Sequence, residues 1–124
     1  MPAVMAAGTQ QTVMRRTIER QFHAEMLAVY DRCADIGFRP VLLRRLVILD
    51  GGVRAAKALI LQPGTTGLER LIERQQSDAS MEALMVSPQY QALFTPTEIH
   101  EARKRLAGSP RERARGRLQA PTSP

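Results

Sequence analysis

The chain has 124 residues, of which 44% are apolar and 24% charged, and its net charge is +6. This length and balance are typical of one soluble globular domain with a modest core. The single cysteine, Cys33, excludes an internal disulfide framework and a cysteine-rich metal site.

The apolar residues are mainly aliphatic, because aromatic side chains make up 4% of the chain and Trp is absent. A core of Leu, Ala, Met, Ile and Val without a strong β-branched excess favours helices over strands. No apolar run approaches the roughly 20 residues that a membrane-spanning helix needs. The first basic residues follow the apolar start instead of preceding it, which is unlike a signal peptide. We therefore expect a cytoplasmic protein that is not associated with a membrane.

The N-terminal part of the chain predicts one long helix. Residues 1–10 lack a periodic pattern, so we expect a flexible N-terminus there. From about residue 11 to residue 36 the pattern is helical, and Gly37 can end the helix in a left-handed conformation. One apolar stripe of this helix is formed by Ile18, Phe22, Met26, Tyr30 and Cys33.

Two short helices are predicted next, joined by Gly51-Gly52. Pro40 is suited to the first turn of the first helix, where its missing N–H costs nothing. Its expected buried face is Leu42, Leu43, Leu46 and Val47. The second helix is expected over about 53–62, before Pro63-Gly64.

Three further helices are indicated by N-terminal capping residues. Thr66 and Glu69 form a capping-box pattern for a helix over about 67–76, and Ser80 can cap a short helix after it. The last helix has the clearest start, with Thr95 as N-cap, Pro96 as first residue and Glu98 as capping-box partner.

These elements predict an all-α fold: a compact single-domain bundle of five to six short helices after one longer N-terminal helix. The helical domain is expected to span 11–107. We interpret 108–124, which is rich in Arg and Pro, as a disordered tail.

The helix–Gly-Gly–helix segment, residues 40–62, has two interpretations. A DNA-reading helix-turn-helix has this length and a glycine in its turn. However, the second helix offers only Arg54 and Lys57 as outward polar groups, whereas base readout usually needs Asn, Gln, Ser, Thr or several arginines. The other interpretation is an α-hairpin that contributes to the core.

Positive charge is concentrated in two places, which is relevant to any anionic partner. Residues 38–63 contain five basic residues against one acid, Asp50, and residues 109–124 contain four arginines against Glu112. These residues are the candidates for nucleic-acid binding: Arg39, Arg44, Arg45, Arg54, Lys57, Arg111, Arg113, Arg115 and Arg117.

The sequence contains no recognisable catalytic pattern. His23 and Cys33 are ten residues apart on one predicted helix, about 15 Å, which is too far for a nucleophile and its base. The Gly51-Gly52 pair has no following Lys-Ser or Lys-Thr, so it is not a phosphate-binding P-loop. We therefore expect no enzymatic activity, no metal and no cofactor.

The region from Phe22 to Leu106 resembles an uncharacterised family of small all-helical bacterial proteins. The resemblance rests on short blocks in the same order: Phe22-His23 with Glu25-Met26 and Tyr30, Gly51-Gly52 with Ala56-Lys57, Thr65-Thr66, Asp78 to Leu84, Pro88 to Tyr90, Leu93 to Thr95 with Glu98, and Ala102 to Leu106. The resemblance implies a compact helical module and carries over no catalytic residues. Neither capping nor core packing explains His23 and Tyr90 fully, so we interpret them as a candidate partner surface.

The function predicted from these observations is that of a non-catalytic bacterial accessory or adaptor protein that binds a protein partner. Its support is the absence of a catalytic pattern and the presence of several Met residues suited to an adaptable surface. The alternative is a small basic DNA- or RNA-binding protein that uses residues 40–62 and the basic tail.

Overall fold

The computed structural model describes the backbone of residues 2–108 and the side chains of residues 11–108. In this part of the chain every regular element is helical, which confirms the predicted all-α class. The elements are α1 (Pro2–Asp35), α2 (Val41–Asp50), α3 (Gly52–Leu59), α4 (Leu68–Glu73), the short 3₁₀ helix η1 (Ser77–Ala79), α5 (Met81–Met85), the 3₁₀ helix η2 (Gln91–Leu93) and α6 (Pro96–Leu106). None of the described helices combines the length and apolar character that crossing a bilayer requires.

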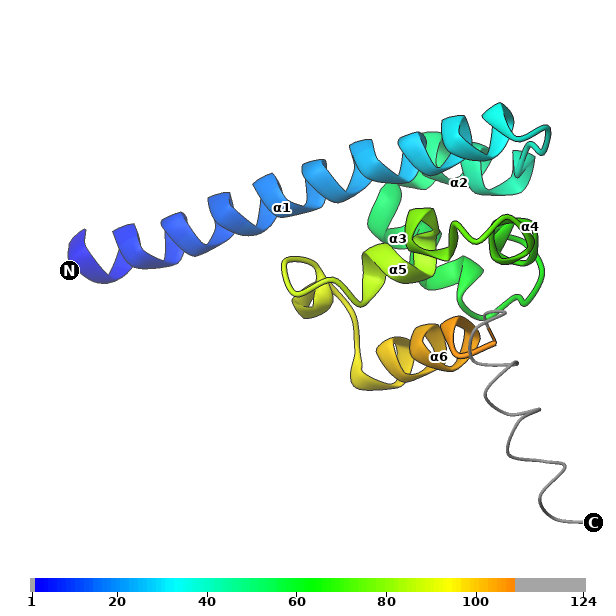
Figure 1. The fold of residues 1–124 in the computed structure, drawn as a ribbon. Coiled ribbons are helices and arrows are strands. Elements are labelled where there is room, and N and C mark those ends of the chain that lie inside the picture. Colours follow the sequence, from blue (N-terminus) through cyan, green and yellow to red (C-terminus); the bar gives the residue numbers. More distant parts are fainter. Residues whose placement is uncertain (1, 109–124) are drawn as a thin grey trace, which may run out of the picture.

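Helix α1 is longer than the sequence pattern predicted, because it begins at Pro2 instead of near residue 11. The added segment contains no interior proline, and its alanines favour a helix even without an apolar stripe. Figure 1 shows the N-terminal half of α1 projecting beyond the other helices, and residues 11–17 are all exposed. The predicted tail lies, from residue 109 on, outside the described residues.

The end of α1 is closed as predicted by Gly37, whose φ is +89°. The Gly37 N–H donates to the Ala34 carbonyl at 3.0 Å and the Phe38 N–H donates to the Cys33 carbonyl at 2.9 Å. This pair of bonds is a Schellman motif, which satisfies carbonyls that the helix end would otherwise leave unpaired.

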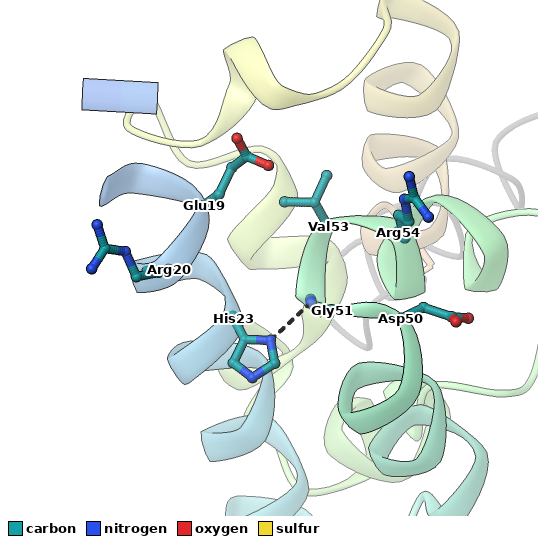
Figure 2. A pocket seen from close by; sticks show the side chains of 8 residues that line it. Glu19, Arg20, His23, Asp50, Gly51, Val53 and Arg54 are labelled. Carbon is teal, nitrogen blue, oxygen red and sulfur yellow. Dashed lines mark hydrogen bonds between the residues drawn. The ribbon is translucent and has the colours of Figure 1, made fainter. Parts of the chain in front are cut away.

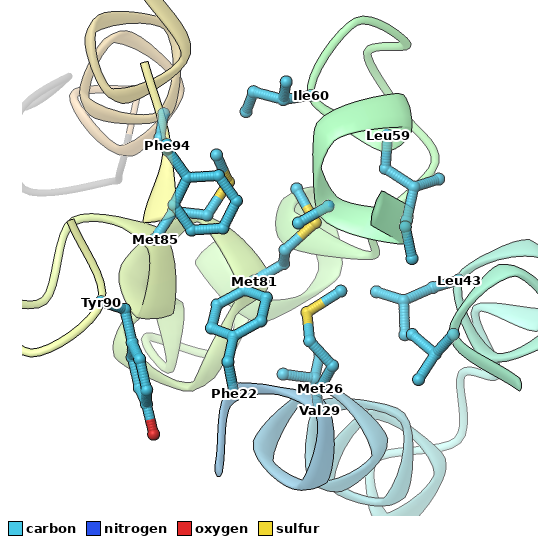
Figure 3. Packing of buried hydrophobic residues seen from close by; sticks show 14 of the residues in the cluster. Phe22, Met26, Val29, Leu43, Leu59, Ile60, Met81, Met85, Tyr90 and Phe94 are labelled. Carbon is cyan, nitrogen blue, oxygen red and sulfur yellow. The ribbon is translucent and has the colours of Figure 1, made fainter. Parts of the chain in front are cut away.

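The core lies between the C-terminal half of α1 and the shorter helices (Figures 1 and 3). Phe22 is at its centre and packs edge-to-face against Tyr90 and Phe94, each with ring centroids 5.2 Å away. Most of the predicted α1 stripe is buried, but Ile18 and Tyr30 are only partly buried. The buried apolar residues around Phe22 include Met26, Val29, Leu43, Val47, Leu59, Met81 and Met85.

Two of the three predicted caps are confirmed. The Ser80 hydroxyl accepts from the Ala83 N–H at 3.1 Å, and Thr95 with Glu98 forms the complete capping box. The predicted capping box at Thr66 is wrong. Gly67, with φ +81°, precedes α4, and Thr66 turns its side chain into the core.

Thr66 donates instead to the carboxylate of Glu82, which has no exposed area. The distance to Oε2 is 2.9 Å, and Arg105 of α6 approaches the same oxygen to 3.2 Å. Arg105 also donates to the carbonyls of Leu59 and Ile60 at the end of α3. One guanidinium therefore connects α3, α5 and α6.

The environment of Glu82 shifts the pKa of its carboxyl group. Burial raises the pKa of Glu82 above its usual 4.5, although hydrogen bonds from Thr66 and Arg105 and the charge of Arg105 oppose this rise. Glu98 shifts the other way. Burial alone would raise its pKa, but the Thr95 N–H and the Lys57 ammonium, 2.9 Å away, lower it below 4.5.

Helices α1 and α3 cross at Gly52. A Cβ on Gly52 would lie 2.6 Å from the His23 Cα, closer than real contacts allow. Gly51 is required for a different reason: its φ of +91° and ψ of +156° belong to a region that is almost restricted to glycine. The Gly51-Gly52 pair is therefore explained by backbone geometry and packing.

We expect Gly52→Ala to destabilise the protein by about 3 kcal/mol or more, because the added methyl group must separate two helix backbones. Gly51→Ala, where nothing lies within 4 Å of the added Cβ, should cost only the backbone strain of about 1–3 kcal/mol. Urea unfolding measures both. The exposed Arg54→Ala is the control and should stay within about 0.5 kcal/mol. A smaller cost for Gly52→Ala than for Gly51→Ala would contradict the close crossing.

The two shifted glutamates predict opposite dependences of stability on pH. Because the pKa of Glu82 is raised by folding, its contribution to stability is complete below 4.5 and is lost as pH rises. Because the pKa of Glu98 is lowered, its contribution is present above 4.5 and is lost as pH falls.

The test is to measure the free energy of unfolding in urea from about pH 3 to about pH 8 for the wild type, Glu82→Gln and Glu98→Gln. Relative to wild type, Glu82→Gln should lose less stability as pH rises above 4.5, and Glu98→Gln should lose less as pH falls below it. Curves parallel to wild type for both variants would show that neither carboxylate titrates differently on folding.

Candidate functional site

A shallow pocket of about 390 Å³ lies between α1 and the α2–α3 turn (Figure 2). Glu19, Arg20 and His23 come from α1, and residues 50–54 form the other wall. The Arg20 side chain points away from α3 in Figure 2. We refer to this feature as the His23 pocket.

The His23 ring has a structural role that its sequence position did not reveal. Its Nδ1 accepts a hydrogen bond from the Gly52 N–H at 3.0 Å. That N–H is one of the donors that the first turn of a helix cannot pair internally, and Gly51 has no side chain to cap it. His23 therefore supplies from α1 the cap that α3 lacks. An accepting Nδ1 requires the neutral ring with its proton on Nε2.

Among the described residues, no group of three or more His, Cys, Asp or Glu side chains could hold a metal ion. Cys33 is buried, and burial followed by the nearby charge of Glu82 raises the pKa of its thiol. A thiol with a raised pKa is a poor nucleophile, because the thiolate is the reactive form.

Tyr90, predicted as part of a partner surface, is in the core with only 2% of its surface exposed. Burial and the neighbouring Glu25 carboxylate raise the pKa of Tyr90 to about 12. Its ring packs edge-to-face on Phe22. The assignment of Tyr90 to an exposed contact surface is therefore corrected: it is a packing residue whose polar end is beside Glu25.

The candidate nucleic-acid residues in the described part of the chain lie in different local environments. Lys57 pairs with Glu98 and is 5.5 Å from the centroid of the Phe94 ring. Arg54 lines the His23 pocket, whereas Arg44 and Arg45 line a groove on α2. Arg39 is exposed in the connection before α2. The arginines at 111, 113, 115 and 117 lie outside the described residues.

Helix α3 lacks the exposure of a DNA-recognition helix. Gly52, Ala55, Ala56 and Leu59 are buried, and Arg54 is its one exposed residue. A recognition helix must present several side chains to base edges. This burial favours the interpretation of residues 40–62 as an α-hairpin of the core.

Helix α2 presents an apolar outer face that the sequence did not reveal. Leu42, predicted as buried, is 37% exposed, and Val41, Ile48 and Leu49 are 63%, 55% and 70% exposed. A shallow groove of about 360 Å³ lies on this face. We call it the α2 groove; it is lined by Tyr30, Val41, Arg44, Arg45, Ile48 and Leu49.

Comparisons with family models, with curated proteins and with solved structures found no match to this chain. The resemblance to a family of small helical bacterial proteins thus stays a prediction.

We expect His23→Ala to lower the free energy of unfolding by about 1–2 kcal/mol, because the Gly52 N–H loses its acceptor. Hydrogen exchange of the Gly52 amide should accelerate in this variant. Arg20→Ala is the matched control, since Arg20 lines the same pocket but is exposed. If His23→Ala changes neither the stability nor the Gly52 exchange rate, His23 does not cap α3. The prediction that His23 belongs to a partner surface would then remain.

Proposed function

We propose that this protein is a non-catalytic bacterial accessory or adaptor protein that binds a protein partner through the α2 groove. The observation that carries this proposal is the exposure of Val41, Ile48 and Leu49 on one side of a ten-residue helix. Large apolar side chains that gather on one surface are typical of interaction sites.

The opposite side of α2 strengthens this argument. Leu43 and Val47 have no exposed area and belong to the core. Helix α2 thus carries large apolar side chains on both sides, and on the outer side Arg44 and Arg45 lie among them. Among the described residues, nothing packs against the outer side of α2. A partner that packed there would remove its exposed apolar surface from water, which favours binding.

The nucleic-acid alternative has less support in this geometry. Lys57 is already paired with Glu98, and Arg54 shares its pocket with the acids Glu19 and Asp50. The two arginines of the α2 groove lie between Val41 and Ile48, whose apolar side chains form no favourable contact with phosphates.

Site-specific photo-crosslinking in cells that express the full chain tests the proposal. A benzoylphenylalanine in place of Leu49 should give discrete adducts with another protein, because Leu49 is the most exposed residue of the groove's apolar side. The same probe in place of Glu73, an exposed residue of α4, is the control and should give none of these adducts.

Adding Ile48→Glu to the Leu49 probe should reduce the adducts roughly tenfold or more, as expected for loss of an interface anchor. Circular dichroism should show an unchanged fold, since Ile48 is exposed. Equal adduct patterns from positions 49 and 73 would overturn the proposal. Adducts with nucleic acid instead of protein would favour the alternative function.

A further inference from the structure

We infer that the partner contributes an acidic amphipathic helix that lies along the α2 groove. This inference rests on the proposed function and specifies the chemistry of the partner.

The apolar residues of the groove have helical spacing. Val41, Ile48 and Leu49 follow one side of α2 over about 12 Å, or roughly two turns. Tyr30 of α1 forms the other wall, so the groove runs between two helices. Grooves of this kind receive the apolar face of a helix through anchors at spacings of three, four and seven residues.

The charge of the groove determines what must flank those anchors. Arg44 and Arg45 line it, and no acidic residue does. The ion pairs among the described residues use Arg15, Lys57 and Arg105, so neither groove arginine has a carboxylate partner there. Arg44 is 5.5 Å from the Tyr30 ring centroid, and Asp50 lines the His23 pocket instead.

A partner that covers this face must neutralise both arginines. Burying an unpaired charge costs several kcal/mol, whereas an arginine and a carboxylate form short, charge-assisted hydrogen bonds. Glu or Asp side chains beside the apolar anchors would meet this requirement. The groove therefore selects an acidic helix over a neutral or basic one.

Other occupants fit this surface less well. A second copy that packed α2 antiparallel on α2 would bring the Arg45 side chains together. Residues 109–124 carry four arginines and one glutamate, the same sign as the groove. On an anionic lipid surface the basic residues of a helix belong to its polar side, whereas Arg44 and Arg45 lie between Val41 and Ile48 in the apolar stripe.

Synthetic helical peptides of about 16 residues, roughly four turns, serve as probes against the isotope-labelled full chain. The first peptide carries leucines at three- and four-residue spacing flanked by glutamates. The second keeps the leucines and replaces every Glu by Lys, and the third is a scrambled acidic sequence. Amide shifts measured by NMR locate the binding site.

The acidic amphipathic peptide should shift the amides of residues 41–49 and bind at least about tenfold tighter than the lysine peptide, a preference of about 1.4 kcal/mol. Arg44→Glu/Arg45→Glu should reverse this preference, and Ile48→Glu should abolish binding of both peptides. Arg103→Glu, on the exposed surface of α6, is the matched charge control and should leave the preference unchanged.

Equal binding of the acidic and lysine peptides would overturn the inference, and so would equal binding of the scrambled peptide or no shift at residues 41–49. If a peptide result of this kind is found while the Leu49 probe still forms protein adducts in cells, the adaptor function remains supported. Only the inference of an acidic helical partner is then wrong. If the Leu49 probe gives no specific adducts, the proposed function fails by its own experiment.

Discussion

The enclosure of the Glu82 carboxylate is the constraint on which most of the helical arrangement depends. It is the only charged side chain among the described residues that is fully buried. Taking a carboxylate out of water costs several kcal/mol unless hydrogen bonds and an opposite charge replace the water. Thr66 and Arg105 supply them from two segments far away in the sequence. The segments before α4, in α5 and in α6 must therefore come together at one point.

This constraint also explains how such short helices persist. Helix α5 has five residues and α4 has six, whereas isolated helices shorter than roughly 12–15 residues are marginal in water. Their stability comes from packing and from the groups that pair their ends. Arg105 contributes twice, because it binds Glu82 of α5 and the carbonyls at the end of α3. The same short helices also pack apolar side chains into the core around Phe22: Leu71 of α4, and Met81 and Met85 of α5.

The elements predicted correctly from the sequence are those whose signals are local. Thr95 and Glu98 are three residues apart and pair with each other, and Gly37 ends α1 through its own backbone. Thr66 shows the limit of such signals: the same spacing to Glu69 is present, but a buried carboxylate 16 residues away takes the hydroxyl. His23 is the reverse case, since it caps a helix 29 residues away and no pattern near it could reveal this.

The candidate site was harder to predict than the fold because periodicity indicates the inner side of a helix only when the other side is polar. In α2 both sides carry large apolar residues, so Leu42 was assigned to the core although Leu43 and Val47 are the residues that pack there. Exposure of Ile48 and Leu49 depends on which side of α2 meets α1 and α3. That choice is made by the tertiary structure.

The Gly51-Gly52 turn determines that choice. In a DNA-reading helix-turn-helix the second helix is presented to the ligand. Here Gly52 lets the second helix, α3, approach the α1 backbone, and His23 holds its first turn there. With α3 turned inward, the first helix, α2, keeps one side in the core and the other in the open. The glycines that suggested a DNA-binding motif thus produce the opposite arrangement, in which the first helix of the pair carries the available surface.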